Sequence, residues 1–332
     1  MHIVLNSFGA SIRRHHSLFE VSTAAGKQAL HPRDVESISV SKGARISSDA
    51  VLLAIENEID VLFVDGLGHP QGRVWSVKYG SISDIRRQQI EFLYSAQAVD
   101  WVKEMVVEKI NNQIAMLLAL KTAEDDRLNR IIHDAINSLE DYKAKARKAR
   151  GESVSDVAPS LRGWEGAASR KYFRVVSEAL PDDYKFETRS RQPATDPFNA
   201  MLNYGYGILY GKIEGALIKA GIDPYVGIFH RDDYNRPALV FDVIEKYRLW
   251  VDYVVIHLCL QKAMSEECFR QEGQALMLDG LGKRIVIQSV NDYLAEIIAI
   301  KGLERSRAEH IQREAHQLAA FFLKSKPRTD DA

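Results

Sequence analysis

Three short segments in the second half of the chain carry carboxylate or imidazole side chains in unusual surroundings. Glu165 lies among small and aromatic residues, which would let a ligand or another backbone come close. His230 ends an apolar stretch and precedes a polar loop. Asp242 and Glu245 would share one face of a helix, where two carboxylates repel each other unless a cation lies near them. All three segments could therefore contribute ligands to a bound cation.

Each of these residues also has an ordinary structural explanation. Glu165 could be a surface glutamate near the start of a helix, where a negative charge is favourable. His230 could cap or pack the end of a buried segment. Glu245 could pair with Arg248 on a half-exposed helix. The sequence alone does not show that the three segments meet, so these explanations stay open.

Taken together, the three segments favour a divalent metal that still binds water and phosphate oxygens. Carboxylate ligands suit Mg2+ or Mn2+, and a single imidazole favours Mn2+. Zinc is disfavoured because no thiolate or second histidine stands at the usual local spacing. A metal of this kind can polarise a phosphodiester and activate an attacking hydroxyl, so the expected chemistry is phosphoryl transfer.

The elements that must position these residues fall into two regions. Residues 1–83 are predicted to form a small β domain with one helix over 50–56, because short β-rich runs alternate with turn formers. Residues 84–332 are predicted to form a larger all-α domain. Its expected helices cover residues 161–180, 197–221, 240–261 and 289–322. The predicted fold class is α+β, with a small N-terminal β-sheet domain followed by the α-helical domain.

Composition is that of an ordinary globular protein. Of 332 residues, 46% are hydrophobic and 27% are charged, which is enough for a sizeable core. The first residues lack the basic and apolar regions of a signal peptide, and no apolar run is long enough to span a membrane. Cys259 and Cys268 are expected to be free thiols in a cytoplasmic protein.

In their order and spacing, these segments resemble the CRISPR-associated integrase and nuclease family Cas1. The family pattern has a Glu in a small-residue helix, then a helix with Asn and Tyr-Gly. A His after an apolar run follows, and then an Asp-x-x-Glu/Asp helix with an aromatic residue and Arg. The matching residues are Glu165, Asn199, Tyr210, Gly211, His230, Asp242, Glu245, Tyr247 and Arg248, with Lys109, Asn112 and Gln113 as a further match. One departure is Leu249-Trp250, where many relatives carry proline after the arginine.

The resemblance implies a metal-dependent DNA endonuclease and integrase that inserts spacer DNA into a CRISPR array. Glu165, His230 and Glu245 would be the catalytic residues and metal ligands. Asp242 would tune the site or bind a second cation. A 3′ hydroxyl of a short duplex would attack a phosphodiester of the array, a transesterification that needs no nucleotide cofactor. The resemblance assigns DNA contacts to Arg170, Lys171, Arg174, Tyr210 and Arg248.

The resemblance also implies partners. The chain would form a homodimer through its β domain, associate with the small protein Cas2, and bind double-stranded DNA as spacer precursor and as repeat array. Its net charge of -1 means that any basic DNA-binding surface must be local.

Two other functions remain open at this stage. A metal hydrolase of small phosphate esters would need an enclosed pocket and no basic track. A non-enzymatic DNA-binding or assembly protein would bind DNA without metal and join no strands.

Overall fold

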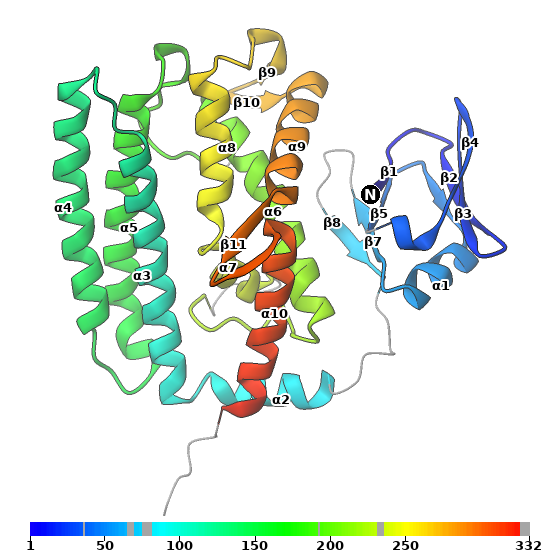
Figure 1. Cartoon of the computed structure of the whole chain (residues 1–332), viewed down its shortest axis with the longest axis horizontal. Coiled ribbons are helices and arrows are strands. Elements are labelled where there is room, and N and C mark those ends of the chain that lie inside the picture. Colours follow the sequence, from blue (N-terminus) through cyan, green and yellow to red (C-terminus); the bar gives the residue numbers. More distant parts are fainter. Residues whose placement is uncertain (36, 65–69, 75–81, 192, 231–235, 326–332) are drawn as a thin grey trace, which may run out of the picture. The chain divides into compact units, whose positions relative to one another are not determined.

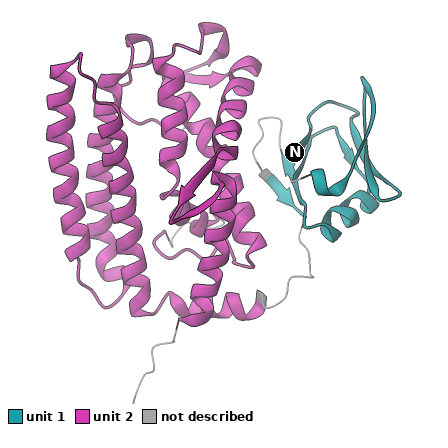
Figure 2. Ribbon diagram, in the orientation of Figure 1, with its two compact units in different colours: residues 1–80 teal, residues 81–332 magenta. Residues whose placement is uncertain are grey.

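The structure is a computed structural model whose chain divides into two compact units, residues 1–80 and residues 81–332 (Figure 2). The first unit is rich in β-strands and the second is mostly helical, which confirms the predicted α+β class (Figure 1). The division falls at residue 80 rather than at the predicted 83. The structure describes the whole chain except residues 36, 65–69, 75–81, 192, 231–235 and 326–332.

Within its described residues, the first unit has two four-stranded sheets and one α-helix. The sheet order is β1-β5-β7-β8 in one and β4-β3-β2-β6 in the other. Helix α1 (Ser48–Glu56) begins after Ser47, whose hydroxyl caps the helix by accepting a hydrogen bond from the backbone of Ala50. The strands are β1 (His2–Leu5), β2 (Ser11–His15), β3 (Leu18–Thr23), β4 (Gly26–Leu30), β5 (Ser37–Ser41), β6 (Arg45–Ile46), β7 (Asp60–Val64) and β8 (Pro70–Arg73).

Alternating side chains explain how these strands build a core. In β5, Ile38 and Val40 are buried while the serines between them are half-buried, which is the period of two that a strand imposes. Phe19 and Val61 pack in the same apolar cluster. Burying each such side chain stabilises the unit by about 1.5–3 kcal/mol.

The second unit is built mainly of long helices. Its helices are α2 (Ile82–Phe92), α3 (Ala96–Ala119), α4 (Asp126–Lys148), α5 (Val154–Ala179), α6 (Pro197–Lys219), α7 (Ala238–Ile244), α8 (Arg248–Leu260), α9 (Gly280–Ala295) and α10 (Arg307–Lys324). Two β-hairpins are inserted, β9 (Phe269–Glu272) with β10 (Ala275–Leu278), and β11 (Ile297–Ile300) with β12 (Leu303–Ser306). The predicted all-α domain therefore also contains strands.

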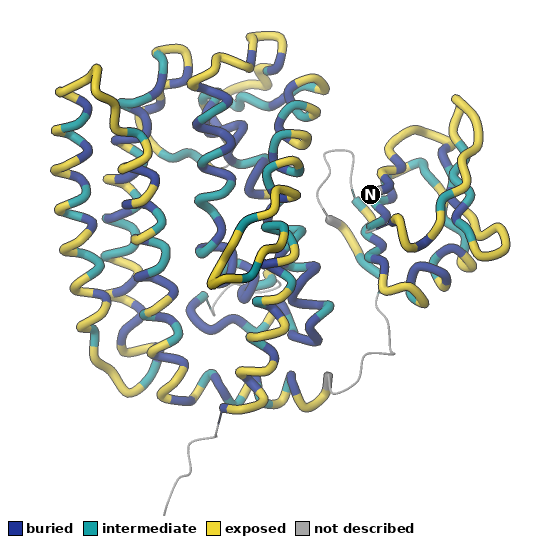
Figure 3. Tube along the Cα trace, viewed as in Figure 1, coloured by how far each residue is buried: buried dark blue, intermediate teal, exposed yellow. Residues whose placement is uncertain are grey.

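Helices α3, α4 and α5 lie side by side, and α6 packs against α7, α8, α9 and α10 (Figure 1). Along α4, buried and exposed positions alternate at helical spacing (Figure 3), with Leu128, Ile132 and Leu139 facing the core. Helix α6 approaches α8 closely at Gly205, where an added Cβ would lie 2.5 Å from Val251. Helix α3 also packs against α5 and α8, and residues of these three helices line the same pocket.

Three predicted helices were wrong in extent. The helix expected over 161–180 is α5, which already begins at Val154 and contains Pro159. The helix expected over 240–261 is two helices, α7 and α8, because the amides of Tyr247 and Trp250 each bond a carbonyl three residues back. The helix expected over 289–322 is α9 and α10 separated by the β11–β12 hairpin, whose turn uses Gly302 at a φ of 77°.

Other expectations from the sequence were confirmed. Cys259 and Cys268 are buried free thiols. Among the described residues, no helix has the length and apolar character needed to cross a membrane.

Candidate active site

Glu165 and Glu245 meet on a single ammonium group. Lys109 of α3 places its Nζ 2.6 Å from Glu245 Oε2 and also donates a hydrogen bond to Glu165 Oε1. Glu165 belongs to α5, and Glu245 caps the carboxyl end of α7. Three elements far apart in the sequence therefore converge at one point, with Lys109 rather than the predicted His230 beside the two glutamates.

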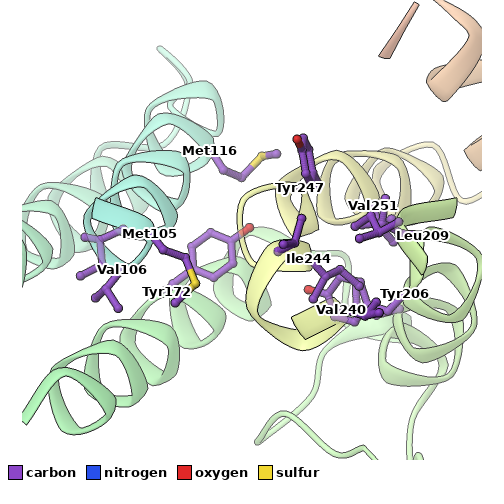
Figure 4. Close-up of a cluster of buried hydrophobic side chains, with 14 of the residues drawn as sticks. Met105, Val106, Met116, Tyr172, Tyr206, Leu209, Val240, Ile244, Tyr247 and Val251 are labelled. Carbon is purple, nitrogen blue, oxygen red and sulfur yellow. The ribbon is translucent and has the colours of Figure 1, made fainter. Parts of the chain in front are cut away.

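The break between α7 and α8 sets the position of Glu245. Lys246, the next residue, pairs with Glu314 of α10 at 2.5 Å, and its carbonyl accepts a hydrogen bond from Asn112 of α3 at 2.9 Å. Tyr247 donates its hydroxyl proton to the same Glu314. In Figure 4, Ile244 and Tyr247 of this corner are packed among core side chains of the neighbouring helices. The corner is thus fixed from two sides and holds Glu245 toward the interior.

The charges of this cluster are mutually stabilised. Burial would raise the pKa of Glu245, but Arg248 and Lys109 outweigh it and lower that pKa to about 2. Burial would lower the pKa of Lys109, yet Glu245 and Glu165 raise it. Arg248 Nε lies 2.9 Å from Glu245 Oε1. Glu245, Lys109 and Arg248 therefore keep their charges at neutral pH.

His230 is held by Asp242. The Asp242 carboxylate is fully buried and lies 2.6 Å from His230 Nδ1. It also accepts hydrogen bonds from the backbone amides of Ile228, Phe229 and His230, at 2.7, 3.0 and 3.1 Å. Both carboxylate oxygens are therefore engaged in shaping the loop that carries the histidine. With the proton on Nδ1, the ring keeps Nε2 as an acceptor or metal ligand.

A second contact ties this loop to the helix of Glu165. Arg162 of α5 donates to the carbonyl of Phe229 at 2.5 Å, and its guanidinium lies 5.1 Å from the centre of the Phe229 ring. Arg162 precedes Glu165 by about one helical turn. The loop that carries His230 therefore packs against the part of α5 that carries Glu165.

The candidate metal ligands fall into two places in the described structure. No three His, Cys, Asp or Glu side chains among the described residues form a group that could hold an ion, so His230 stands apart from the pair of glutamates. The pair itself fits a divalent cation, because it already shares one positive group. Glu245 Oε2 is also buried without a hydrogen bond of ordinary geometry. Carboxylate donors of this kind suit Mg2+ or Mn2+.

A pocket of about 740 Å³ opens beside the two glutamates. Its lining includes guanidinium groups, which would attract phosphates. The arginines that line it are Arg170, Arg174, Arg189, Arg191 and Arg248. Three of the predicted DNA-contact residues therefore lie at the pocket.

Two other predicted DNA contacts lie elsewhere. Lys171 points to α4, where its Nζ donates to the Ser138 hydroxyl at 2.8 Å. Tyr210 packs its ring 5.3 Å from that of Phe241, and burial raises its pKa.

The departure at Leu249-Trp250 leaves the corner intact. Leu249 lines the pocket, and the Trp250 ring packs 4.9 Å from Tyr247. The turn therefore forms without the proline that many relatives carry.

A buried acid beneath Arg248 escaped the sequence analysis. Asp252 is 4% exposed and accepts hydrogen bonds from Tyr172 at 2.9 Å and from Tyr206 at 2.5 Å. The Arg248 guanidinium lies 4.5 Å from the centre of the Tyr206 ring. Burial raises the pKa of Asp252 to about 6, although both tyrosine bonds oppose the shift. An acid inside the apolar run 249–256 was the signal that could have revealed it.

Asp252→Asn is expected to flatten the pH dependence of stability. In the unfolded chain this carboxyl loses its proton near its ordinary value of 3.8, whereas in the folded protein it keeps the proton to about pH 6. The folded state then binds more protons, so stability from this group is greatest at low pH and is lost as pH rises through this window.

Urea unfolding at pH 5 and pH 7 measures the effect. The unfolding free energy of the variant relative to wild type should rise by about 1 kcal/mol between these pH values. The control Asp100→Asn removes an exposed carboxylate paired with Lys103, and its difference from wild type should not change. A pH-independent difference for Asp252→Asn would contradict the raised pKa.

Known proteins resemble this chain over almost its whole length. The model of the family described as CRISPR associated protein Cas1 matches residues 3–292. The chain belongs to the Cas1 family. The resemblance inferred from the motifs is therefore confirmed. A curated Cas1 relative, CRISPR-associated endonuclease Cas1 1 of Archaeoglobus fulgidus, is 29% identical over 334 residues, which cover 97% of this chain and 96% of that protein.

Solved structures share the Cas1 fold. A chain described as Cas6-RT-Cas1--Cas2 complex superposes with a TM-score of 0.79 at 22% identity, covering 99% of this chain and 35% of that one. A casposase bound to integration product gives a TM-score of 0.75 at 21% identity, covering 100% of this chain and 96% of that one. At these identities the likeness establishes the Cas1 fold.

Proposed function

We propose that this chain is a metal-dependent DNA endonuclease and integrase that inserts spacer DNA into a CRISPR array. The observation that carries the proposal is the meeting of Glu165 and Glu245 on one cation, beside a pocket lined with arginines. Membership of the Cas1 family supports it, as do a relative named as an endonuclease and a casposase described with an integration product.

Glu165 and Glu245 would hold the metal, Mg2+ or Mn2+, and His230, which stands apart from them in the structure, would move in to join them as a ligand. When bound, the metal would polarise the scissile phosphate and lower the pKa of the attacking hydroxyl. Asp242 keeps the His230 ring oriented through Nδ1, a contact that leaves Nε2 for coordination. Arg248 holds Glu245 ionised and fixes the direction of its carboxylate. Asp242 thus acts here as a positioning residue.

The pocket arginines would bind the DNA backbone and place the reacting phosphate. Guanidinium groups of Arg170 and Arg174 are suited to bidentate contact with phosphate oxygens. A 3′ hydroxyl of the spacer duplex then attacks the phosphorus of an array phosphodiester. The new P–O bond replaces the old one, and the displaced strand leaves with its own 3′ hydroxyl. Lys171 and Tyr210 are proposed DNA contacts outside the pocket.

The proposed partners follow from the same family membership. A homodimer formed through residues 1–83 and association with Cas2 would place two active sites on one DNA duplex. One chain that shares the fold belongs to a structure described as a complex with Cas2, which supports this assembly.

Strand joining tests the function directly. Purified full-length protein would be mixed with a labelled short duplex and a plasmid that carries a repeat array, with Mn2+, with Mg2+ or with a chelator. Joined product that needs the metal is expected. No joining by the wild-type protein, even with its Cas2 partner present, would reject the proposal in favour of an assembly role or a smaller phosphate ester substrate.

Binding of DNA without metal should depend steeply on salt, and Arg174→Ala should reduce that dependence. Each phosphate neutralised contributes about −0.9 to the slope of log affinity against log salt, so losing one arginine contact should lower the slope by about one. Fluorescence anisotropy with chelator present measures it. Arg305→Ala, which changes an exposed arginine of the β11–β12 hairpin, is the control with an unchanged slope. Equal slopes for wild type and Arg174→Ala would remove Arg174 from the DNA contacts.

A further inference from the structure

We propose that Lys109 is a resident cation that fills the metal site in the free protein and gives way to the metal when DNA binds. This inference rests on the proposed function, because it concerns the same two glutamates. Lys109 reaches the site from α3, whereas the glutamates come from α5 and from the end of α7. Its side chain is 13% exposed, so the ammonium is largely removed from water.

The first step is that the two carboxylates need a positive group between them. The Glu245 side chain is 10% exposed and that of Glu165 is 23% exposed. Two close, poorly solvated carboxylates repel each other, and burying either charge without a partner is costly. Lys109 removes both costs. The site is therefore stable without metal because it brings its own cation.

The second step is that lysine and metal compete for the same oxygens. Lys109 Nζ contacts Glu165 Oε1 and Glu245 Oε2, the atoms that face each other across the site. Ser169 of α5 also donates to Glu165 Oε1, at 3.2 Å, and holds it in this position. A divalent ion that binds both oxygens has to displace the ammonium.

The third step concerns the balance of charge. The two glutamates are neutralised by Lys109 and Arg248, so a divalent ion in place of the ammonium would leave the cluster with one excess positive charge. The displaced ammonium carries a second. Phosphate groups of DNA in the adjacent pocket would supply the missing negative charge. Lys109 also lines this pocket, so the displaced ammonium can pair with a phosphate oxygen. Metal and DNA should consequently bind cooperatively, with Lys109 as the coupling group.

The test measures Mn2+ binding by the full chain, with and without a short duplex. The electron paramagnetic resonance signal of free Mn2+ reports how much of the metal is unbound. In wild type, duplex should strengthen Mn2+ binding by about tenfold, within the usual range of coupling between ligands. Lys109→Met keeps the length of the side chain and removes its charge. This variant should bind Mn2+ about tenfold more tightly without DNA and gain little from duplex. Lys103→Met, one to two turns earlier on α3 and paired with Asp100, should behave as wild type.

Thermal unfolding supplies an independent readout. Without metal, Lys109→Met should unfold at a lower temperature than wild type, and Mn2+ should restore its stability more than it stabilises wild type. Lys109→Gln retains a hydrogen-bond donor, so it serves if the methionine variant does not fold, with the same expected direction in Mn2+ affinity.

The outcomes separate this inference from the proposed function. Equal or weaker Mn2+ binding by both Lys109 variants, in a protein whose wild type binds Mn2+ and joins strands, would overturn the resident cation alone. Absence of Mn2+ binding in wild type and in both variants, with duplex present, would overturn the metal site and with it the inference. Tighter binding by the variants, lost again when Glu165→Ala is added, would support both.

Discussion

Glu165→Gln is expected to reduce strand joining by on the order of a thousandfold, comparable to removing a group that stabilises transition-state charge. The amide has nearly the shape of the carboxylate but carries no charge, so it is a poor ligand for Mg2+ or Mn2+. The fold should be unaffected, because the side chain is partly exposed and keeps its hydrogen-bond acceptor toward Ser169. The measurement is the initial rate of joining by purified wild type and variant at saturating metal.

DNA binding separates this effect from a general defect. Anisotropy with chelator present should give the same affinity for Glu165→Gln and wild type, because the pocket arginines are unchanged. Glu296→Gln removes a surface glutamate that pairs with Arg307, and it should join strands at the wild-type rate. A Glu165→Gln protein that retains a tenth or more of the wild-type rate would exclude Glu165 as a metal ligand.

Asp242→Ala is expected to destabilise the second unit by about 4 kcal/mol. The carboxylate is completely buried and accepts three backbone amides in addition to the contact with His230 Nδ1. Removing it leaves those donors without a partner in a dry region, and each such loss costs about 1–3 kcal/mol. Urea unfolding followed by circular dichroism measures the change in unfolding free energy.

A capping aspartate is the matched control. Asp279 accepts one amide, that of Gly282, at the start of α9, so Asp279→Ala should cost only about 1 kcal/mol. A loss for Asp242→Ala no larger than that of the control would mean that the loop of His230 does not depend on Asp242. Asp242→Ala should also lose more strand-joining activity than its lower stability explains, because the His230 ring is no longer oriented.

Local patterns predicted most of the regular structure. The short strands of the first unit and its helix over 50–56 are decided by neighbours in the sequence, and both were confirmed. The break between α7 and α8 was missed because its stabilising partner, Glu314, lies 68 residues from Lys246. No pattern within a short window reports such a contact.

Residues of the candidate site also fall into two groups: those recognisable from their sequence neighbours and those whose role depends on distant contacts. Glu165 and Glu245 were singled out by their surroundings, and the structure brings them together. Lys109 was noticed only as part of a family motif, since its role depends on an ion pair across 56 residues with Glu165. Asp252 was overlooked as a site residue because its chemistry arises from burial and from hydrogen bonds to tyrosines distant in the sequence.

The contact of Glu314 with the α7–α8 corner has a consequence for how the protein is made. A nascent chain emerges from the ribosome in order, and α10 is the last helix that the structure describes. Until that helix arrives, Lys246 and Tyr247 lack one of the carboxylates that hold the corner, Glu314. The corner that carries Glu245 would therefore take its final form only after α10 has been synthesised.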